Sequence, residues 1–126
     1  MSSIIGIGSD FVEIDRVRKA IEKNQHFMER VFTENEISCC KRKANPWQSF
    51  AARFAAKEAV SKAFGVGLGA MGLTNIEVLN KAGGQPVATL YGTAKALAEE
   101  KNVRNVHVSL SHSEIYAMAT AVAEGD

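Results

Sequence analysis

The chain has 126 residues, of which 46% are hydrophobic and 23% charged, values typical of one folded domain. They exclude a disordered chain, a collagen and a disulfide scaffold. The 15 Lys and Arg residues against 14 Asp and Glu leave a net charge of +1, so no overall field favours nucleic acid or an anionic membrane. No apolar run approaches the roughly 18 residues of a membrane span. We expect a single domain over residues 1–126, in the cytoplasm.

The N-terminal segment has the alternation of a short strand. Ile5 and Ile7 alternate with Gly6 and Gly8, and we expect the strand to end at Asp10. A carboxylate at a strand exit behind two glycines is well placed to reach into a cleft. The alternative is a carboxylate that caps a turn or a helix.

The next segment has the spacing of an amphipathic helix. Apolar residues recur from Ile14 through Val17 to Ile21, and the opposite face carries a basic stripe, made of Arg16, Lys19 and Lys23. Such a stripe is either a solvated face or a docking patch for an acidic partner.

Two further helices have recognisable starts. Thr33 and Glu36 form a capping-box pattern, which opens a short helix containing two adjacent cysteines. Adjacent cysteines make a poor disulfide, so we expect both to be reduced. Asn45 as N-cap and Pro46 as first residue begin the longest helix, which we expect to end at Gly65.

The second half of the chain alternates between loops, strands and one helix. We expect an irregular glycine-rich loop, a hairpin of two strands, a helix and a final pair of strands, at residues 65–72, 75–79 with 86–91, 93–101, and 106–110 with 116–123. This order predicts an α+β fold with a mainly antiparallel sheet packed on the long helix.

The long helix carries the most informative pattern. Its apolar stripe, Trp47, Phe50 and Phe54, continues into Glu58 and Lys62. Charged groups on an inward-facing stripe are costly unless they pair or bind something, so this half of the helix is a candidate cleft wall. The alternative is an i,i+4 ion pair between Glu58 and Lys62 on an exposed face.

Three features near this helix suggest a metal and phosphate site. Asp10 and Glu58 would offer oxygen ligands to Mg²⁺, although spacing does not show that they meet. The glycine-rich loop follows Lys57 and Lys62, and its backbone is either a phosphate contact or a plain connector. His112, which we expect in a turn between two strands, is either a phosphate contact or an exposed histidine.

Three stretches resemble a known family. They are GIGSDFVEIDR at residues 6–16, FAARFAAKEAVSKAFGVG at residues 50–67 and VSLSHSEIYAMA at residues 108–119. They resemble the holo-acyl-carrier-protein synthases, the small bacterial 4'-phosphopantetheinyl transferases.

The resemblance implies an activity and an assembly. Such an enzyme transfers the 4'-phosphopantetheine arm of coenzyme A to a serine of apo-acyl carrier protein, releases adenosine 3',5'-bisphosphate and supports fatty acid biosynthesis. The family's fold is a small α+β unit assembled as a homotrimer with active sites at the subunit interfaces. The rival interpretation is a non-catalytic module that binds coenzyme A, a nucleotide or a protein.

The resemblance also implies roles for individual residues. Asp10 and Glu58 would bind Mg²⁺ and would be catalytic together with Lys62. The serine's proton acceptor stays open between a metal-bound water, Glu58 and Lys62. Arg16 would contact the acidic carrier protein. The coenzyme would be bound by a group of basic residues and one glycine, namely Arg53, Lys57, Lys62, Gly65 and His112.

Overall fold

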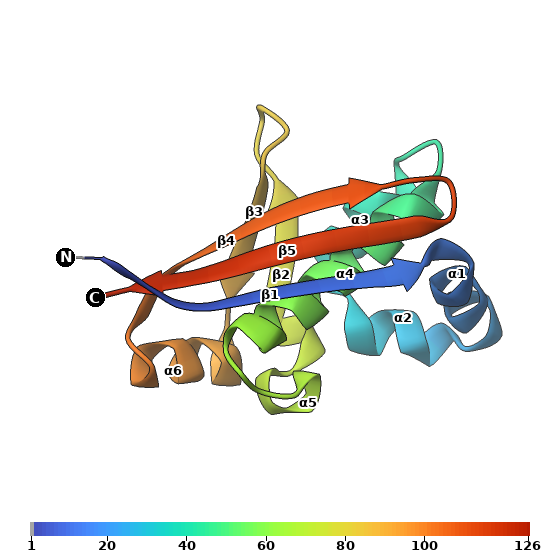
Figure 1. Cartoon of the computed structure of the whole chain (residues 1–126). Coiled ribbons are helices and arrows are strands. Elements are labelled where there is room, and N and C mark those ends of the chain that lie inside the picture. Colours follow the sequence, from blue (N-terminus) through green and yellow to red (C-terminus); the bar gives the residue numbers. More distant parts are fainter. Residues whose placement is uncertain (1) are drawn as a thin grey trace.

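The computed structural model describes residues 2–126, which form a three-stranded sheet with helices on one face (Figure 1). The sheet contains β1 (Ser3–Glu13), β4 (Val103–His112) and β5 (Tyr116–Gly125). All pairings are antiparallel and β5 lies in the centre. The expected α+β class with an antiparallel sheet is confirmed.

The inner face of the sheet packs on α4 (Pro46–Ala63). The small side chains of β5 that point inward are buried, namely Ala117, Ala119, Ala121 and Ala123. On β1, a Cβ atom at Gly8 would lie 2.1 Å from the carbonyl oxygen of Ala59 on α4. Small residues therefore bring the sheet and the long helix into close contact. The inward-facing alanines of β5 thus pack on α4 of the same chain.

Three short helices cover one end of α4, and the two N-caps that the sequence predicts, for the third of these helices and for α4, are confirmed. They are α1 (Ile14–Lys23), α2 (Gln25–Val31) and α3 (Glu34–Lys41). Thr33 and Glu36 form the capping box at α3, and Asn45 caps α4. Every helix within residues 2–126 is too short or too polar to cross a membrane.

The remaining elements lie at the other end of α4 and along its side. They are α5 (Leu68–Met71), a 3₁₀ turn η1 (Leu73–Asn75), the hairpin β2 (Ile76–Asn80) with β3 (Pro86–Leu90), and α6 (Gly92–Glu100). In Figure 1 the turn between β2 and β3 projects beyond β4, and α6 lies far from α1.

The outer face of the three-stranded sheet exposes large apolar side chains. Ile7 is 68% exposed, Phe11 66% and Met118 53%. Phe11 and Met118 lie opposite each other on β1 and β5. The burial on β5 alternates accordingly, with alanines inward and larger residues outward.

Three expectations need correction. β1 does not end at Asp10 but runs on to Glu13, because Gly6 and Gly8 serve close packing on α4 and do not break the strand. The glycine-rich segment is not wholly irregular, since it contains α5. His112 is the last residue of β4 and not a turn residue.

Candidate active site

The structure brings three of the predicted site residues together. Asp10 points from the inner face of β1 toward α4, and Lys62 Nζ donates to Asp10 Oδ1 at 3.1 Å. Lys62 Nζ also donates to the carbonyl oxygen of Ser9 at 3.1 Å. Among residues 2–126, Lys62 forms its ion pair with Asp10 and not with Glu58. The i,i+4 pair that the sequence offered as an alternative is therefore replaced by a contact between α4 and β1.

Glu58 lies beside this ion pair in a partly buried position. Burial raises the pKa of its carboxyl group, the negative charge of Asp10 raises it further, and the positive charge of Lys62 opposes both. Asp10 and Glu58 are thus near enough to repel each other. Two carboxylates that repel each other form an attractive place for a cation.

An open cleft of about 610 Å³ begins at these carboxylates. Asp10, Glu13 and Glu58 line its acidic part, and the rest of the wall is mostly apolar, made of Phe11, Val12, Val17, Ala20, Phe27, Phe54 and Tyr116. The cleft is bounded by β1, α1, α2 and α4. An acidic end beside an apolar wall suits a ligand that has a less polar part and a head group that is positively charged or bound to a cation.

Arg16 on α1 also lines the cleft. The basic stripe around it is partly neutralised within the helix, because Lys19 pairs with Asp15 at 2.9 Å. The neighbouring Arg18 pairs with Glu22 at 3.4 Å. Of the predicted stripe, Arg16 is the member that the structure places at the cleft.

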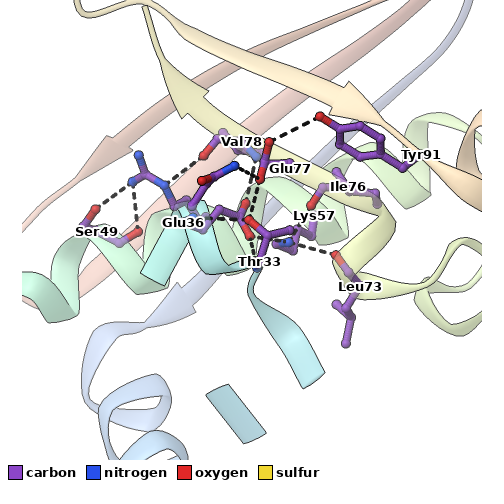
Figure 2. A network of polar contacts seen from close by, with 11 residues as sticks. Thr33, Glu36, Ser49, Lys57, Leu73, Ile76, Glu77, Val78 and Tyr91 are labelled. Atoms are coloured by element: carbon purple, nitrogen blue, oxygen red, sulfur yellow. Dashed lines mark hydrogen bonds and ion pairs between the residues drawn. The ribbon is translucent and has the colours of Figure 1, made fainter. Parts of the chain in front are cut away.

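Lys57, predicted to bind the coenzyme, lies on the other flank of α4 inside a polar network (Figure 2). Its side chain and that of Glu36 are both 0% exposed and form an ion pair at 2.8 Å. Lys57 Nζ also donates to the carbonyl oxygens of Leu73 and Ile76. An ammonium group has three N–H bonds. All three are used here, so the expectation that Lys57 holds a phosphate is corrected.

Burial also affects the charge of Lys57. Burial lowers the pKa of Lys57, and the carboxylates of Glu36 and Glu77 oppose that shift. The Glu36 carboxylate further accepts from the backbone N–H of Val78 at 2.7 Å and of Thr33 at 2.9 Å. The pair is therefore enclosed and bonded on all sides, as a buried ion pair requires.

Arg53, also predicted to bind the coenzyme, is 3% exposed and belongs to the same network. Its guanidinium group donates to the carbonyl oxygen of Val78 at 2.9 Å, to Ser49 Oγ at 2.6 Å and to Asn80 Oδ1 at 2.8 Å. Its hydrogen bonds to Val78 and Asn80 therefore join α4 to β2. Arg53 is not in the cleft of Asp10 and Glu58.

His112 and Arg53 line a second hollow, of about 430 Å³. Its wall also includes Lys43, Asn45 and Asn80. Gly65 lies directly after α4 with a φ of 72°, a backbone conformation that favours glycine. Within one chain, the predicted coenzyme-binding residues are thus dispersed. Arg53 and His112 line this second hollow, Lys57 is buried in the network, and Lys62 pairs with Asp10.

Comparisons with known proteins connect this geometry to a family. The model of the 4'-phosphopantetheinyl transferase superfamily matches residues 6–121. The chain belongs to this superfamily. The holo-[acyl-carrier-protein] synthase of Ruminiclostridium cellulolyticum is 49% identical over 119 residues, which cover 92% of this chain and 89% of that protein.

Solved structures of holo-acyl-carrier-protein synthases have the same fold. The one from Neisseria meningitidis superposes with a TM-score of 0.88 at 34% identity, covering 96% of this chain and 98% of that one. The one from Helicobacter pylori, in complex with coenzyme A, gives a TM-score of 0.82 at 33% identity, covering 93% and 98%. The resemblance noted from the three sequence motifs is confirmed.

The donor set at the cleft of this phosphopantetheinyl transferase fits Mg²⁺. Within residues 2–126 there is no cluster of three or more His, Cys, Asp or Glu residues that would enclose a metal by itself. Mg²⁺ commonly takes only one or two carboxylates, keeps several waters and completes its shell with substrate phosphates. Asp10 and Glu58, which both line the cleft, would supply such a partial shell of oxygens.

The sequence reasoning missed part of this transferase's cleft. It did not predict α2, and therefore missed Phe27, which lines the apolar wall. The signal was present, because Phe27, Met28 and Val31 have helical spacing behind the N-cap Asn24. Glu13 was missed as well, since β1 was expected to end before it.

Proposed function

We propose that this chain transfers the 4'-phosphopantetheine group of coenzyme A to a serine of apo-acyl carrier protein, with release of adenosine 3',5'-bisphosphate. The observation that carries the proposal is that Asp10 and Glu58 lie together at the acidic end of an open cleft, with Lys62 paired to Asp10 beside it. Relatives named holo-[acyl-carrier-protein] synthase and a related structure with bound coenzyme A support it.

Phosphoryl transfer is catalysed mainly by positioning the reactants and neutralising the negative charge on the phosphates, and less by covalent catalysis. The serine oxygen forms a bond to the phosphorus that bears the pantetheine arm as its proton passes to a base at the cleft, and the bond from that phosphorus to the bridging oxygen breaks. Negative charge then develops on the leaving phosphate. The Lys62 ammonium, held between β1 and α4 by Asp10 and the Ser9 carbonyl oxygen, is placed to attract the diphosphate and to stabilise that charge.

Mg²⁺ is the cofactor we propose. Asp10 and Glu58 would hold it, with the coenzyme diphosphate completing its shell. When bound, the ion supplies positive charge to the diphosphate oxygens. Asp10 would then contact both the ion and Lys62, using its two carboxylate oxygens.

We propose further that the active enzyme is a homotrimer with each active site at a subunit interface. The outer sheet face supports this, since Ile7, Phe11 and Met118 are more than half exposed and such apolar surface favours a partner. An interface would also supply the wall that the open cleft lacks. His112 and Gly65 would contact the coenzyme there, with Arg53 lining the same surface from inside.

Arg16 is the residue we propose for recognition of the carrier protein. It is exposed, belongs to α1 and lies at the rim of the cleft. A positive rim charge attracts an acidic partner and orients it. We also assign the holo-carrier product to fatty acid biosynthesis and the reaction to the cytoplasm, where the free cysteines Cys39 and Cys40 stay reduced.

One experiment tests the activity. Purified chain is incubated with apo-acyl carrier protein, coenzyme A and Mg²⁺, and the intact mass of the carrier is measured. We expect the carrier to gain the mass of one phosphopantetheine. An unchanged carrier mass, together with measurable coenzyme binding, would support the non-catalytic module instead.

The assembly has its own test. Light scattering after size exclusion, repeated on dilution into the assay range, should report a mass near three chains. A stable monomer with full activity at that dilution would contradict a shared active site.

A further inference from the structure

Within residues 2–126, one edge of the strand β2 is not covered by another strand, and side chains of α3 and α4 bond to it instead. β2 pairs with β3 on one side only. On the other side the Val78 N–H donates to Glu36 Oε2 at 2.7 Å, and the Val78 carbonyl oxygen accepts from Arg53 Nε at 2.9 Å. The Ile76 carbonyl oxygen accepts from Lys57 Nζ. The backbone groups of this edge are therefore satisfied by three buried charged residues, as Figure 2 shows.

Of these three residues, Lys57 is the one that also bonds to η1, just before β2. Its Nζ donates to the Leu73 carbonyl oxygen at 2.8 Å, 16 residues further along the chain. Between Lys57 and Leu73 the chain leaves α4, passes through Gly65, Gly67, Gly69 and Gly72, and returns. Glycines allow a segment many conformations. The hydrogen bond from Lys57 to Leu73 therefore restricts the backbone conformations that this segment can adopt.

The opposite side of α4 is fixed by β1. A Cβ atom at Gly6 would lie 1.8 Å from the Ala63 carbonyl oxygen, and one at Gly8 would lie 2.8 Å from Lys62 Cβ. These contacts hold the C-terminal half of α4 against the sheet. Lys57 holds the same half against β2 and the returning segment, and Glu58 and Lys62 stand between the two contacts.

We propose that Lys57, with Glu36 as its counter-charge, is a positioning residue for the transfer reaction. It holds the far end of the glycine-rich segment at Leu73, while the near end is fixed to α4 by the Gly65 N–H, which donates to the Lys62 carbonyl oxygen at 2.9 Å. Residues 66–72 are thus held at both ends relative to Glu58 and Lys62. The proposal rests on the proposed function, because it assumes that the coenzyme diphosphate meets Lys62 and the backbone of this segment. Lys57 itself touches no substrate, since its three N–H bonds end inside the protein.

The chemistry of a buried ion pair fits this role. Well-packed apolar residues of similar volume often stabilise a fold as well as a buried ion pair does. The ammonium group adds a defined geometry, because its ion pair with Glu36 and its two hydrogen bonds join α4 to α3, η1 and β2. Phe32, whose ring centroid is 5.7 Å from Lys57 Nζ, closes the network from the side of α3.

The test compares two lysines of the same helix. Lys57→Met removes the hydrogen bond from α4 to Leu73. Lys62→Met removes the positive charge that pairs with Asp10 beside the cleft. Each variant is measured for its midpoint of thermal unfolding, for amide hydrogen exchange and for coenzyme A affinity by calorimetry. The KM values for coenzyme A and carrier protein are measured well below the unfolding midpoint.

For Lys57→Met we expect faster exchange in residues 66–75 with unchanged exchange in β1 and β5. Coenzyme A affinity should fall and its KM should rise by about tenfold or more, with the KM for carrier protein nearly unchanged. For Lys62→Met we expect wild-type exchange and a lower kcat. A lower unfolding midpoint for Lys57→Met with wild-type coenzyme affinity and KM would overturn the proposal, because that is the result of a purely structural role.

A second variant covers the case in which Lys57→Met does not fold. Glu36→Gln combined with Lys57→Met leaves no unpaired buried charge and should fold, with the same exchange and affinity changes. If neither variant folds, Lys57 belongs to the fold as a whole and the positioning role is rejected. If the wild-type chain transfers no phosphopantetheine, the proposed function fails, while exchange in residues 66–75 still tests the hydrogen bond from Lys57 to Leu73.

Discussion

Glu58 and Lys62 stand on one flank of α4, where Glu58 lines the open cleft and Lys62 pairs with Asp10 beside it, whereas Arg53 and Lys57 stand on the other flank inside the protein. Lys62 is 53% exposed in its side chain and pairs with Asp10, which is 20% exposed. Lys57 pairs with Glu36, and both side chains are 0% exposed. The two flanks carry the same kinds of charge, yet only the first has charge left for a ligand.

The difference lies in the number of hydrogen bonds that each cation makes inside the chain. Lys57 uses all three of its N–H bonds on the protein, and two of the acceptors are backbone carbonyl oxygens. Lys62 uses two, and it lies at the surface. A charged residue that satisfies the backbone stabilises a fold, and one that keeps a free bond beside a carboxylate pair is available for chemistry.

The largest expected effect comes from Gly8→Ala, which disturbs both flanks at once. The new Cβ atom would lie 2.1 Å from the Ala59 carbonyl oxygen and 2.7 Å from the Ala63 nitrogen. We expect unfolding to become easier by about 3 kcal/mol and transfer to be lost, because β1 and Asp10 must move away from α4. Urea unfolding measures the first effect and carrier mass the second.

The matched control for that substitution is Gly83→Ala in the hairpin turn. A Cβ atom there meets nothing within 4 Å, so the free energy of unfolding should change by less than about 0.5 kcal/mol. Equal stability of the Gly8 and Gly83 variants would show that β1 does not rest on α4 as described.

The next effect separates the flanks. Glu58→Gln and Asp10→Asn should each fold with a near wild-type unfolding midpoint and lose transfer rate on the order of 10²-fold. The Mg²⁺ concentration for half-maximal rate should rise in both, because each loses a charged oxygen ligand. Steady-state rates over a Mg²⁺ series measure this. A wild-type rate in either variant at limiting Mg²⁺ would remove that carboxylate from the site.

A smaller effect is expected at the rim. Arg16→Glu should raise the KM for carrier protein several-fold and flatten its salt dependence, since rim charges act mainly on encounter. The KM for coenzyme A should stay nearly the same. Lys101→Glu makes the same change of charge beyond α6, far from the cleft, and should leave both KM values unchanged. Equal damage to both KM values in Arg16→Glu would place Arg16 among the coenzyme contacts.

The smallest effect concerns stability and pH without metal. The pKa of Glu58 is raised in the folded state, mainly by burial. The folded chain therefore holds this proton to a higher pH than the unfolded chain, and stability falls as pH rises through the raised pKa. Glu58→Gln should unfold at a slightly higher temperature than wild type at pH 8 and at the same temperature at pH 4. The reverse order at pH 8 would mean that Glu58 is stabilised as an anion.

The sequence was sufficient for the fold and for the cleft flank of α4. Alternation, the capping residues Thr33 and Asn45, and the glycines are local signals, and they correctly predicted most elements. The change from an apolar to a charged stripe indicated Glu58, which lines the cleft, and Lys62, which pairs with Asp10 beside it. Their meeting with Asp10 needed the structure, because contacts between residues 52 positions apart leave no local pattern.

The buried flank was not predictable from spacing. Lys57 and Lys62 are five positions apart in one helix, and nothing local shows which of them meets Glu36. The capping box correctly predicted the bond between Glu36 and Thr33, but the second role of Glu36 depends on β2 arriving beside α3. Tertiary packing decides such a choice, and composition does not.

The central claim is that the cleft flank of α4 performs the transfer, and single-turnover measurement of carrier mass on Lys62→Met tests it most directly. Wild type and the exposed control Lys101→Met should convert apo-carrier to the phosphopantetheinylated form at the same rate. Lys62→Met should fold normally and convert it about 10²-fold more slowly. Conversion by Lys62→Met at the wild-type rate would contradict the claim.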